Sequence, residues 1–116
     1  MILNEIRAKL EELDDNVFYG AFDKSRIQDA LWNYTVFNRA PTSVSKDRTS
    51  YTDYFDIHIV RENYVPEGTD KEYIDKLLEI PGVRLAENNL EYDYARKGNT
   101  NTVVEMLTIR ILKARK

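Results

Sequence analysis

The chain has 116 residues, of which 42% are apolar and 32% are charged. This composition predicts one globular domain, residues 1–116, and excludes a disordered chain, which lacks the apolar surface needed to offset the entropy of ordering. The formal net charge of −3 disfavours nucleic acid as a main partner, because a polyanion attracts basic surfaces.

The first half of the chain predicts one helix and three strands. Apolar residues at steps of three and four predict an amphipathic helix over about residues 2–14. Aromatic and β-branched residues then predict strands over residues 17–22, 31–37 and 51–60. Residues 39–50, RAPTSVSKDRTS, contain almost no apolar side chains and are expected to be a mobile loop.

The second half predicts a short helix and a final pair of strands. Thr69 and Glu72 have the spacing of a capping box, and Pro81 and Gly82 end the helix that follows. Residues 90–94 alternate between apolar and acidic side chains, and a longer strand follows from residue 103, after a turn at residues 97–101.

This order of elements predicts an α+β fold, with a mixed or antiparallel sheet of about five strands and two helices packed on it. The strand that begins at residue 103 is apolar on both faces in its middle. We therefore expect it to be central in the sheet, or to be covered on its second face by a neighbouring subunit.

The sequence offers little for catalysis. His58 shares a strand face with Asp56 and Glu62, which is a weak candidate for a metal or acid–base cluster, but the chain has no second histidine and no cysteine to complete a ligand set. The alternation of these polar residues with apolar ones is equally explained if the polar residues simply face solvent on one side of a strand. The four glycines are isolated, so no phosphate-binding loop is present. We expect no enzymatic activity and no cofactor.

Charge and aromatic residues point instead to interfaces. The first helix and the residues just after it are acidic, and the C-terminal strand ends in basic residues. This charge distribution reflects either ordinary solvation of surface elements or complementary contact between copies of the chain. The chain has eight tyrosines, more than one small sheet needs in its core. The candidate interface residues are Tyr51, Tyr54, Tyr92, Tyr94, Arg110, Lys113 and Arg115. The candidate assembly loop contributes Arg39, Lys46, Asp47 and Arg48.

Four segments together carry a resemblance to a known family. They are LDDNVFYG at the end of the first helix, the strand YFDIHIV, the short helix IDKLLEIPGV and the final hairpin EYDYARKGNTNTVVEMLTIRILKARK. In their order and length these elements resemble the tail-terminator or tail-completion proteins, which join head and tail in long-tailed bacteriophages and prophages.

The resemblance implies a structural subunit of the virion tail or neck that forms a homohexameric ring. Such a ring stops growth of the tail tube and binds tail-tube and head-connector proteins. The resemblance also implies that the loop at residues 39–50 contacts the tube or lines the lumen and orders on assembly. The resemblance further implies synthesis in the cytoplasm of a bacterial host. No apolar run approaches the length of a membrane span, so we expect no membrane partner.

Two alternatives to the terminator stay open at this point. The first alternative is another phage neck or head-closure component. The second is a cytosolic protein-binding module that is unrelated to virions and uses its exposed tyrosines to bind a partner.

Overall fold

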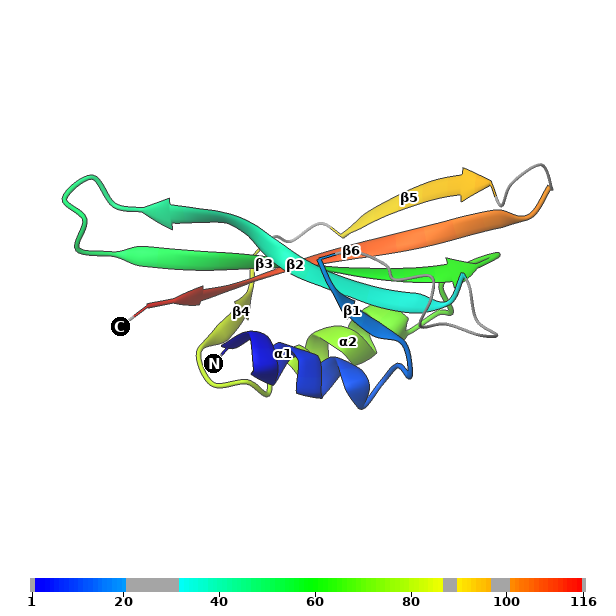
Figure 1. Ribbon diagram of the computed structural model, residues 1–116, viewed down its shortest axis with the longest axis horizontal. Coiled ribbons are helices and arrows are strands. Elements are labelled where there is room, and N and C mark those ends of the chain that lie inside the picture. The colour runs from blue at the N-terminus through cyan, green and yellow to red at the C-terminus, as the bar shows by residue number, and fades with distance from the viewer. Residues whose placement is uncertain (1, 21–31, 87–89, 97–100, 116) are drawn as a thin grey trace.

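A computed structural model describes residues 2–20, 32–86, 90–96 and 101–115 of the chain (Figure 1). In chain order the elements are α1 (Ile2–Glu11), β1 (Val17–Tyr19), β2 (Tyr34–Val44), β3 (Tyr51–Glu62), α2 (Thr69–Leu77), β4 (Val83–Leu85), β5 (Glu91–Arg96) and β6 (Val103–Ala114). The predicted α+β class is confirmed. The observed order differs from the predicted one by β4, a three-residue strand between α2 and β5.

The six strands form one mixed sheet. Its order is β1-β2-β3-β6-β4, and β5 lies beside β6 on the same edge as β4. Only β1 and β2 are parallel, and all other pairs are antiparallel. Because β6 pairs with β3 on one edge and with β4 and β5 on the other, the first of the two alternatives expected for this strand, a central position, is confirmed.

Both helices pack on the same face of this sheet (Figure 1). Alternate residues of β3 and β6 face them, because side chains in a strand point to opposite faces with period two. The core formed there is apolar apart from the hydroxyls of Tyr73 and of Thr35, which is also fully buried. Its fully buried members include Ile6, Leu10, Phe37, Ile57, Ile59, Tyr73, Leu77, Leu107, Ile109 and Ile111.

The β2–β3 hairpin extends well beyond the helices (Figure 1). We expected residues 39–50 to be a loop, but this was wrong for residues 39–44, which continue β2. Ladder hydrogen bonds to β3 hold this part as a strand despite its polar composition, with a register shift between Ala40 and Ser43. A hydrogen-bonded ladder with solvent on both faces needs no apolar alternation, so the sequence pattern did not reveal it.

The start of α2 also differs from its predicted form. The N-cap is Gly68, with a φ of 87° and no side-chain capping bond, so the capping box expected from Thr69 and Glu72 is not formed. The amide of Glu72 instead donates to the carbonyl of Gly68 over 3.0 Å. The end of the strand predicted at 17–22, the start of the one at 31–37 and most of the turn at 97–101 lie outside the described residues.

Candidate functional site

The sheet face opposite the helices carries a short row of polar side chains. His58 of β3 lies between Asn38 of β2 and Thr108 of β6. Thr108 is its direct partner in the register of β3 and β6, and Asn38 is the partner of Asp56, two residues earlier on β3. Its Nδ1 is 2.9 Å from Thr108 Oγ1 and its Nε2 is 3.0 Å from Asn38 Oδ1. A neutral ring protonated at Nε2 satisfies both contacts, and burial lowers the pKa of His58 below 6.5.

Asp56, two residues earlier on β3, is held by Arg110 of β6. The guanidinium donates from Nε to Oδ1 over 2.7 Å and from Nη2 to Oδ2 over 3.1 Å. The sequence raised Asp56, His58 and Glu62 as a weak metal-site candidate, and placed Arg110 at an interface. The structure instead commits Asp56 and His58 to neighbours in the sheet. Among the described residues, no group of three or more histidines and carboxylates is placed to hold a metal ion.

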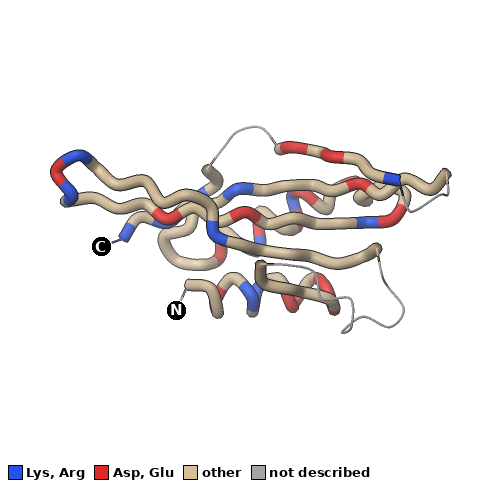
Figure 2. Tube along the Cα trace, turned by 45° about the horizontal axis from the view of Figure 1, so that its top comes forward, with Lys and Arg blue, Asp and Glu red and all other residues tan. Residues whose placement is uncertain are grey.

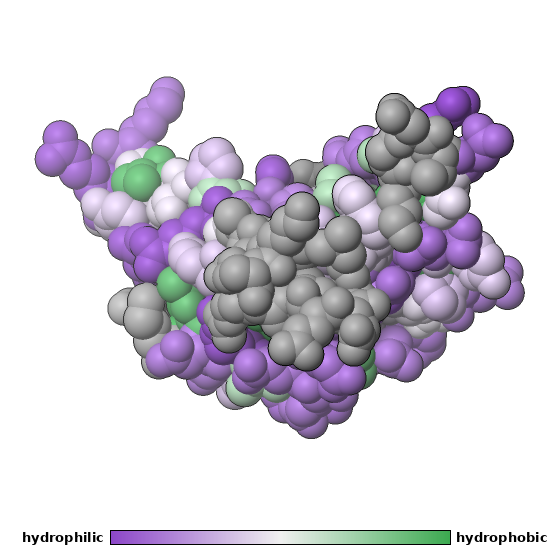
Figure 3. Space-filling view, turned by 45° about the vertical axis from the view of Figure 1, so that its right-hand side comes forward, coloured by the Kyte–Doolittle hydropathy of each residue, from purple (hydrophilic) through white to green (hydrophobic). Residues whose placement is uncertain are grey.

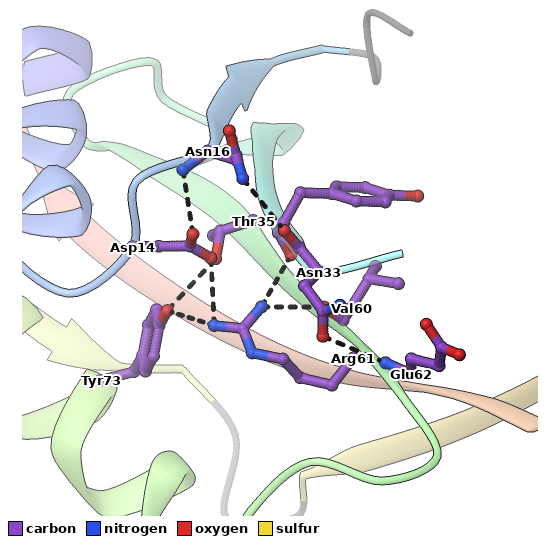
Figure 4. Close-up of polar contacts among 9 residues, drawn as sticks. Asp14, Asn16, Asn33, Thr35, Val60, Arg61, Glu62 and Tyr73 are labelled. Atoms are coloured by element: carbon purple, nitrogen blue, oxygen red, sulfur yellow. Dashed lines mark hydrogen bonds and ion pairs between the residues drawn. The ribbon is translucent and has the colours of Figure 1, made fainter. Parts of the chain in front are cut away.

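A second polar cluster is buried on the helix side of the sheet (Figure 4). Asp14, just after α1, accepts a hydrogen bond from Thr35 Oγ1 over 2.7 Å and is 3.0 Å from Arg61 Nη2. The backbone amide of Asn16 also donates to its carboxylate over 3.0 Å. The side chains of Asp14 and Arg61 are only 7% and 18% exposed. An ion pair with so little exposure is stable only when further hydrogen bonds satisfy both partners, as they do here.

Tyr73 of α2 completes this cluster. Its hydroxyl accepts from Arg61 Nη2 over 3.1 Å and lies 3.3 Å from Thr35 Oγ1. Since the threonine proton goes to Asp14, the tyrosine proton goes to Thr35. Burial raises the pKa of Tyr73 above 10.0. The cluster ties the end of α1, β2, β3 and α2 together. Sequence reasoning missed it, because its members are far apart in the chain.

A groove of about 920 Å³ lies where β3 and β4 begin and β6 ends, near the start of α1. Its apolar lining includes Ile2, Phe55 and Leu112. Asp53 also lines it, and receives two hydrogen bonds of 2.8 Å from Arg115, which lower the pKa of this carboxyl below 3.8. Arg84 and Lys113 line it as well, and neither makes an ion pair with any residue that the structure describes. The predicted interface residues Lys113 and Arg115 therefore lie in one groove.

The four candidate tyrosines fall into two separate groups. Tyr51 and Tyr54 are half-buried, and Tyr51 lies directly after the hairpin turn, paired with Val44. The guanidinium of Arg115 lies 5.0 Å from the centre of the Tyr51 ring. Tyr92 and Tyr94 lie on β5 and are 44% and 65% exposed. A hydrogen bond to Glu105 raises the pKa of Tyr94 above 10.0.

Tyr64, just after β3, is 67% exposed and was not singled out from the sequence. It sits in a loop between elements, where no periodic pattern marks exposure. The amide of Val65 next to it donates to Glu105 over 2.7 Å, so the same carboxylate holds this loop and Tyr94. The aromatic surface near β5 is therefore larger than the sequence indicated.

The predicted assembly segment divides between a strand and a turn. Arg39 is an exposed residue of β2, whereas Lys46, Asp47 and Arg48 lie in the turn between β2 and β3. Asp47 Oδ1 accepts from both the hydroxyl and the amide of Thr49, and from the hydroxyl of Ser45 over 2.7 Å. These bonds lower the pKa of Asp47 to about 2. The turn is thus held by its own side chains.

Two of the acidic residues predicted for the first helix and the residues after it form ion pairs within the chain. Glu12 forms ion pairs with Lys9 and Lys76, at 3.9 and 3.5 Å, and Asp14 is buried against Arg61. The acidic residues with no ion-pair partner among the described residues include Glu91 and Asp93, on exposed strand β5. Figure 2 shows these acidic positions on β5 and the basic positions at the hairpin turn.

No protein-family model matches the chain, and no curated protein is similar to it. None of the described helices is both long and apolar enough to cross a membrane.

Proposed function

We propose that the protein is a non-catalytic structural subunit of a long-tailed bacteriophage particle, a tail terminator or tail-completion protein. In this role it forms a homohexameric ring in the tail or neck of the virion. The ring caps the tail tube on one side and meets the head connector on the other. Repeated heterologous contacts around a closed ring are the physical basis of such an assembly.

The projecting β2–β3 hairpin is the observation that carries this proposal. Residues 41–44 and 46–50 are all exposed, so the outer hairpin adds little buried surface to its own chain. Its turn is nevertheless ordered by hydrogen bonds, including Ser45 N to Ser50 O over 2.9 Å. Among the coloured, described residues of the face in Figure 3, hydrophilic ones predominate. A preformed polar hairpin of this kind suits contact with a partner, because little ordering entropy is lost on binding.

The hydrogen bonding of the open sheet face supports a non-catalytic role. His58 uses both ring nitrogens on Asn38 and Thr108, and Asp56 uses both oxygens on Arg110. Side chains engaged in this way stabilise the sheet, and they are not poised to move a substrate proton.

Electron microscopy of the purified protein, with co-sedimentation against a tail-tube protein, tests the proposal. We expect rings of one defined symmetry, and binding of those rings to the tube. Lys46→Glu together with Arg48→Glu should weaken tube binding and leave the ring intact, while Lys71→Glu on α2 serves as a matched charge reversal outside the hairpin.

A strict monomer at high concentration that does not bind tail-tube protein refutes the proposal. Rings that bind only a head connector identify another neck component. A monomer that binds a soluble host protein identifies the cytosolic module instead.

A further inference from the structure

The groove beside β4 and the exposed strand β5 carry opposite charges that are not neutralised within the described part of the chain. Arg84 and Lys113 both line the groove, and the carboxylate of its lining, on Asp53, is already bound by Arg115. Arg84 pairs with Leu112 and Lys113 pairs with Val83, so the two basic side chains leave the sheet on opposite faces. The groove therefore carries one cation on each side of the β4–β6 edge, beside apolar side chains.

Strand β5 has the complementary chemistry. All six of its residues are exposed, and its acidic side chains alternate with tyrosines in the order Glu91, Tyr92, Asp93, Tyr94. The acids thus lie on one face of the strand and the aromatic rings on the other. Arg96 shares the face of the rings, so the strand offers two carboxylates on one face and two tyrosines with one guanidinium on the other.

Among the described strands, β5 pairs only with β6, so none of them pairs with its outer edge. Its register with β6 runs from Glu91 to Arg96 without a shift, and the strand contains no proline. The outer part of β2 differs, because Pro41 and a register shift between Ala40 and Ser43 interrupt it. Prolines and bulges protect sheet edges from pairing, so β5 is the less protected of the two edges.

The two surfaces lie on different halves of the molecule, as Figure 1 shows for β4 and β5. A contact between unlike surfaces of identical subunits is heterologous, and it generates a closed ring when the rotation between subunits closes. We infer that the groove lined by Arg84 and Lys113 receives strand β5 of a second copy of this chain. This inference rests on the proposed ring function and names the two surfaces that meet in it.

Charge-reversal variants of the full chain test this contact. The groove variant carries Arg84→Glu and Lys113→Glu, and the strand variant carries Glu91→Lys and Asp93→Lys. Each variant by itself places like charges opposite one another across the contact. We therefore expect its dissociation constant for assembly, measured by analytical ultracentrifugation, to rise by more than about tenfold. Lys71→Glu is the control for a charge reversal elsewhere, and circular dichroism checks that each variant is folded.

Mixing the two variants provides the decisive measurement. In the mixture, the glutamates in the groove of the groove variant meet the lysines on β5 of the strand variant. The native basic groove of the strand variant meets the native acids on β5 of the groove variant. Both kinds of contact are attractive, so the mixture should assemble although neither variant does so alone. Loss of assembly at higher salt in the wild type should accompany this result, because exposed charge pairs are screened.

The outcomes separate this inference from the proposed function. A wild-type protein that stays monomeric overturns both. A wild-type assembly with folded variants that assemble equally well overturns the groove–strand contact and leaves the ring proposal standing. Variants that fail alone and also fail as a mixture likewise overturn the contact.

Discussion

The helix-covered part of the sheet and the projecting hairpin are built from the same two strands but differ in what stabilises them. On β3, Phe55, Ile57 and Ile59 are at most 3% exposed beneath the helices. Further out on the hairpin, Val44 is 46% exposed and the turn is polar. The comparison indicates that the stability of the fold resides in the first region, whereas the second is available for contact with partners.

The largest difference between the two regions should appear on truncating an apolar side chain in each. Leu107→Ala removes a fully buried side chain and should lower the free energy of unfolding by about 2 to 5 kcal/mol. Val44→Ala on the hairpin should change it by less than about 0.5 kcal/mol. Urea denaturation measures both, and equal losses would contradict the division of roles.

Breaking the buried ion pair on the helix side should have the next largest effect. Arg61→Met leaves the carboxylate of Asp14 buried without its cation, which costs about 3 kcal/mol of stability. The loss stays at the low end because Thr35 and Asn16 still donate to Asp14.

The matched control for Arg61→Met is Lys71→Met, which breaks an exposed helical pair with Asp75. Its expected cost is less than about 0.5 kcal/mol. Thermal denaturation compares the two variants, and a similar loss in both would show that burial does not strengthen the Asp14 pair.

The hairpin turn should respond locally rather than globally. Asp47→Ala removes the acceptor that holds Ser45 and Thr49, so amide hydrogen exchange at residues 45–50 should accelerate. The melting temperature should change by only a degree or two. Protection that survives the substitution would show that backbone hydrogen bonds alone hold the turn.

Acid should loosen the same turn in the wild type. The pKa of Asp47 is lowered to about 2, so the carboxylate stabilises the turn above pH 3.8 and this contribution is lost as the pH falls from 3.8 towards 2. Chemical shifts of the Thr49 amide follow this titration directly.

The smallest expected effect is a pH dependence from His58. Burial lowers its pKa below 6.5, although Asp56 and Asp93 nearby partly oppose this. The unfolded chain therefore binds a proton more readily, and the stability contributed by the neutral ring is present above pH 6.5 and is lost as the pH falls below it. Melting temperatures between pH 7 and pH 5 should fall more in the wild type than in His58→Gln.

Sequence patterns were sufficient where burial is regular. Ile6 and Leu10 follow the helical period, and Phe55, Ile57 and Ile59 follow the strand period, so the first helix and the central strands were predicted. Patterns failed where backbone pairing alone decides the structure. Residues 39–44 form a strand with solvent on both faces, and β4 has three residues, too few for any period to show.

By itself, the sequence determined the α+β class, the first helix and the central strands. These properties depend on composition and on local periodicity, which a linear chain displays directly. Only the tertiary structure placed Asp14 beside Arg61, His58 between Asn38 and Thr108, and Lys113 in one groove with Arg84. Contacts between distant residues depend on strand register and helix packing, because a shift of one residue moves a side chain to the other face of the sheet.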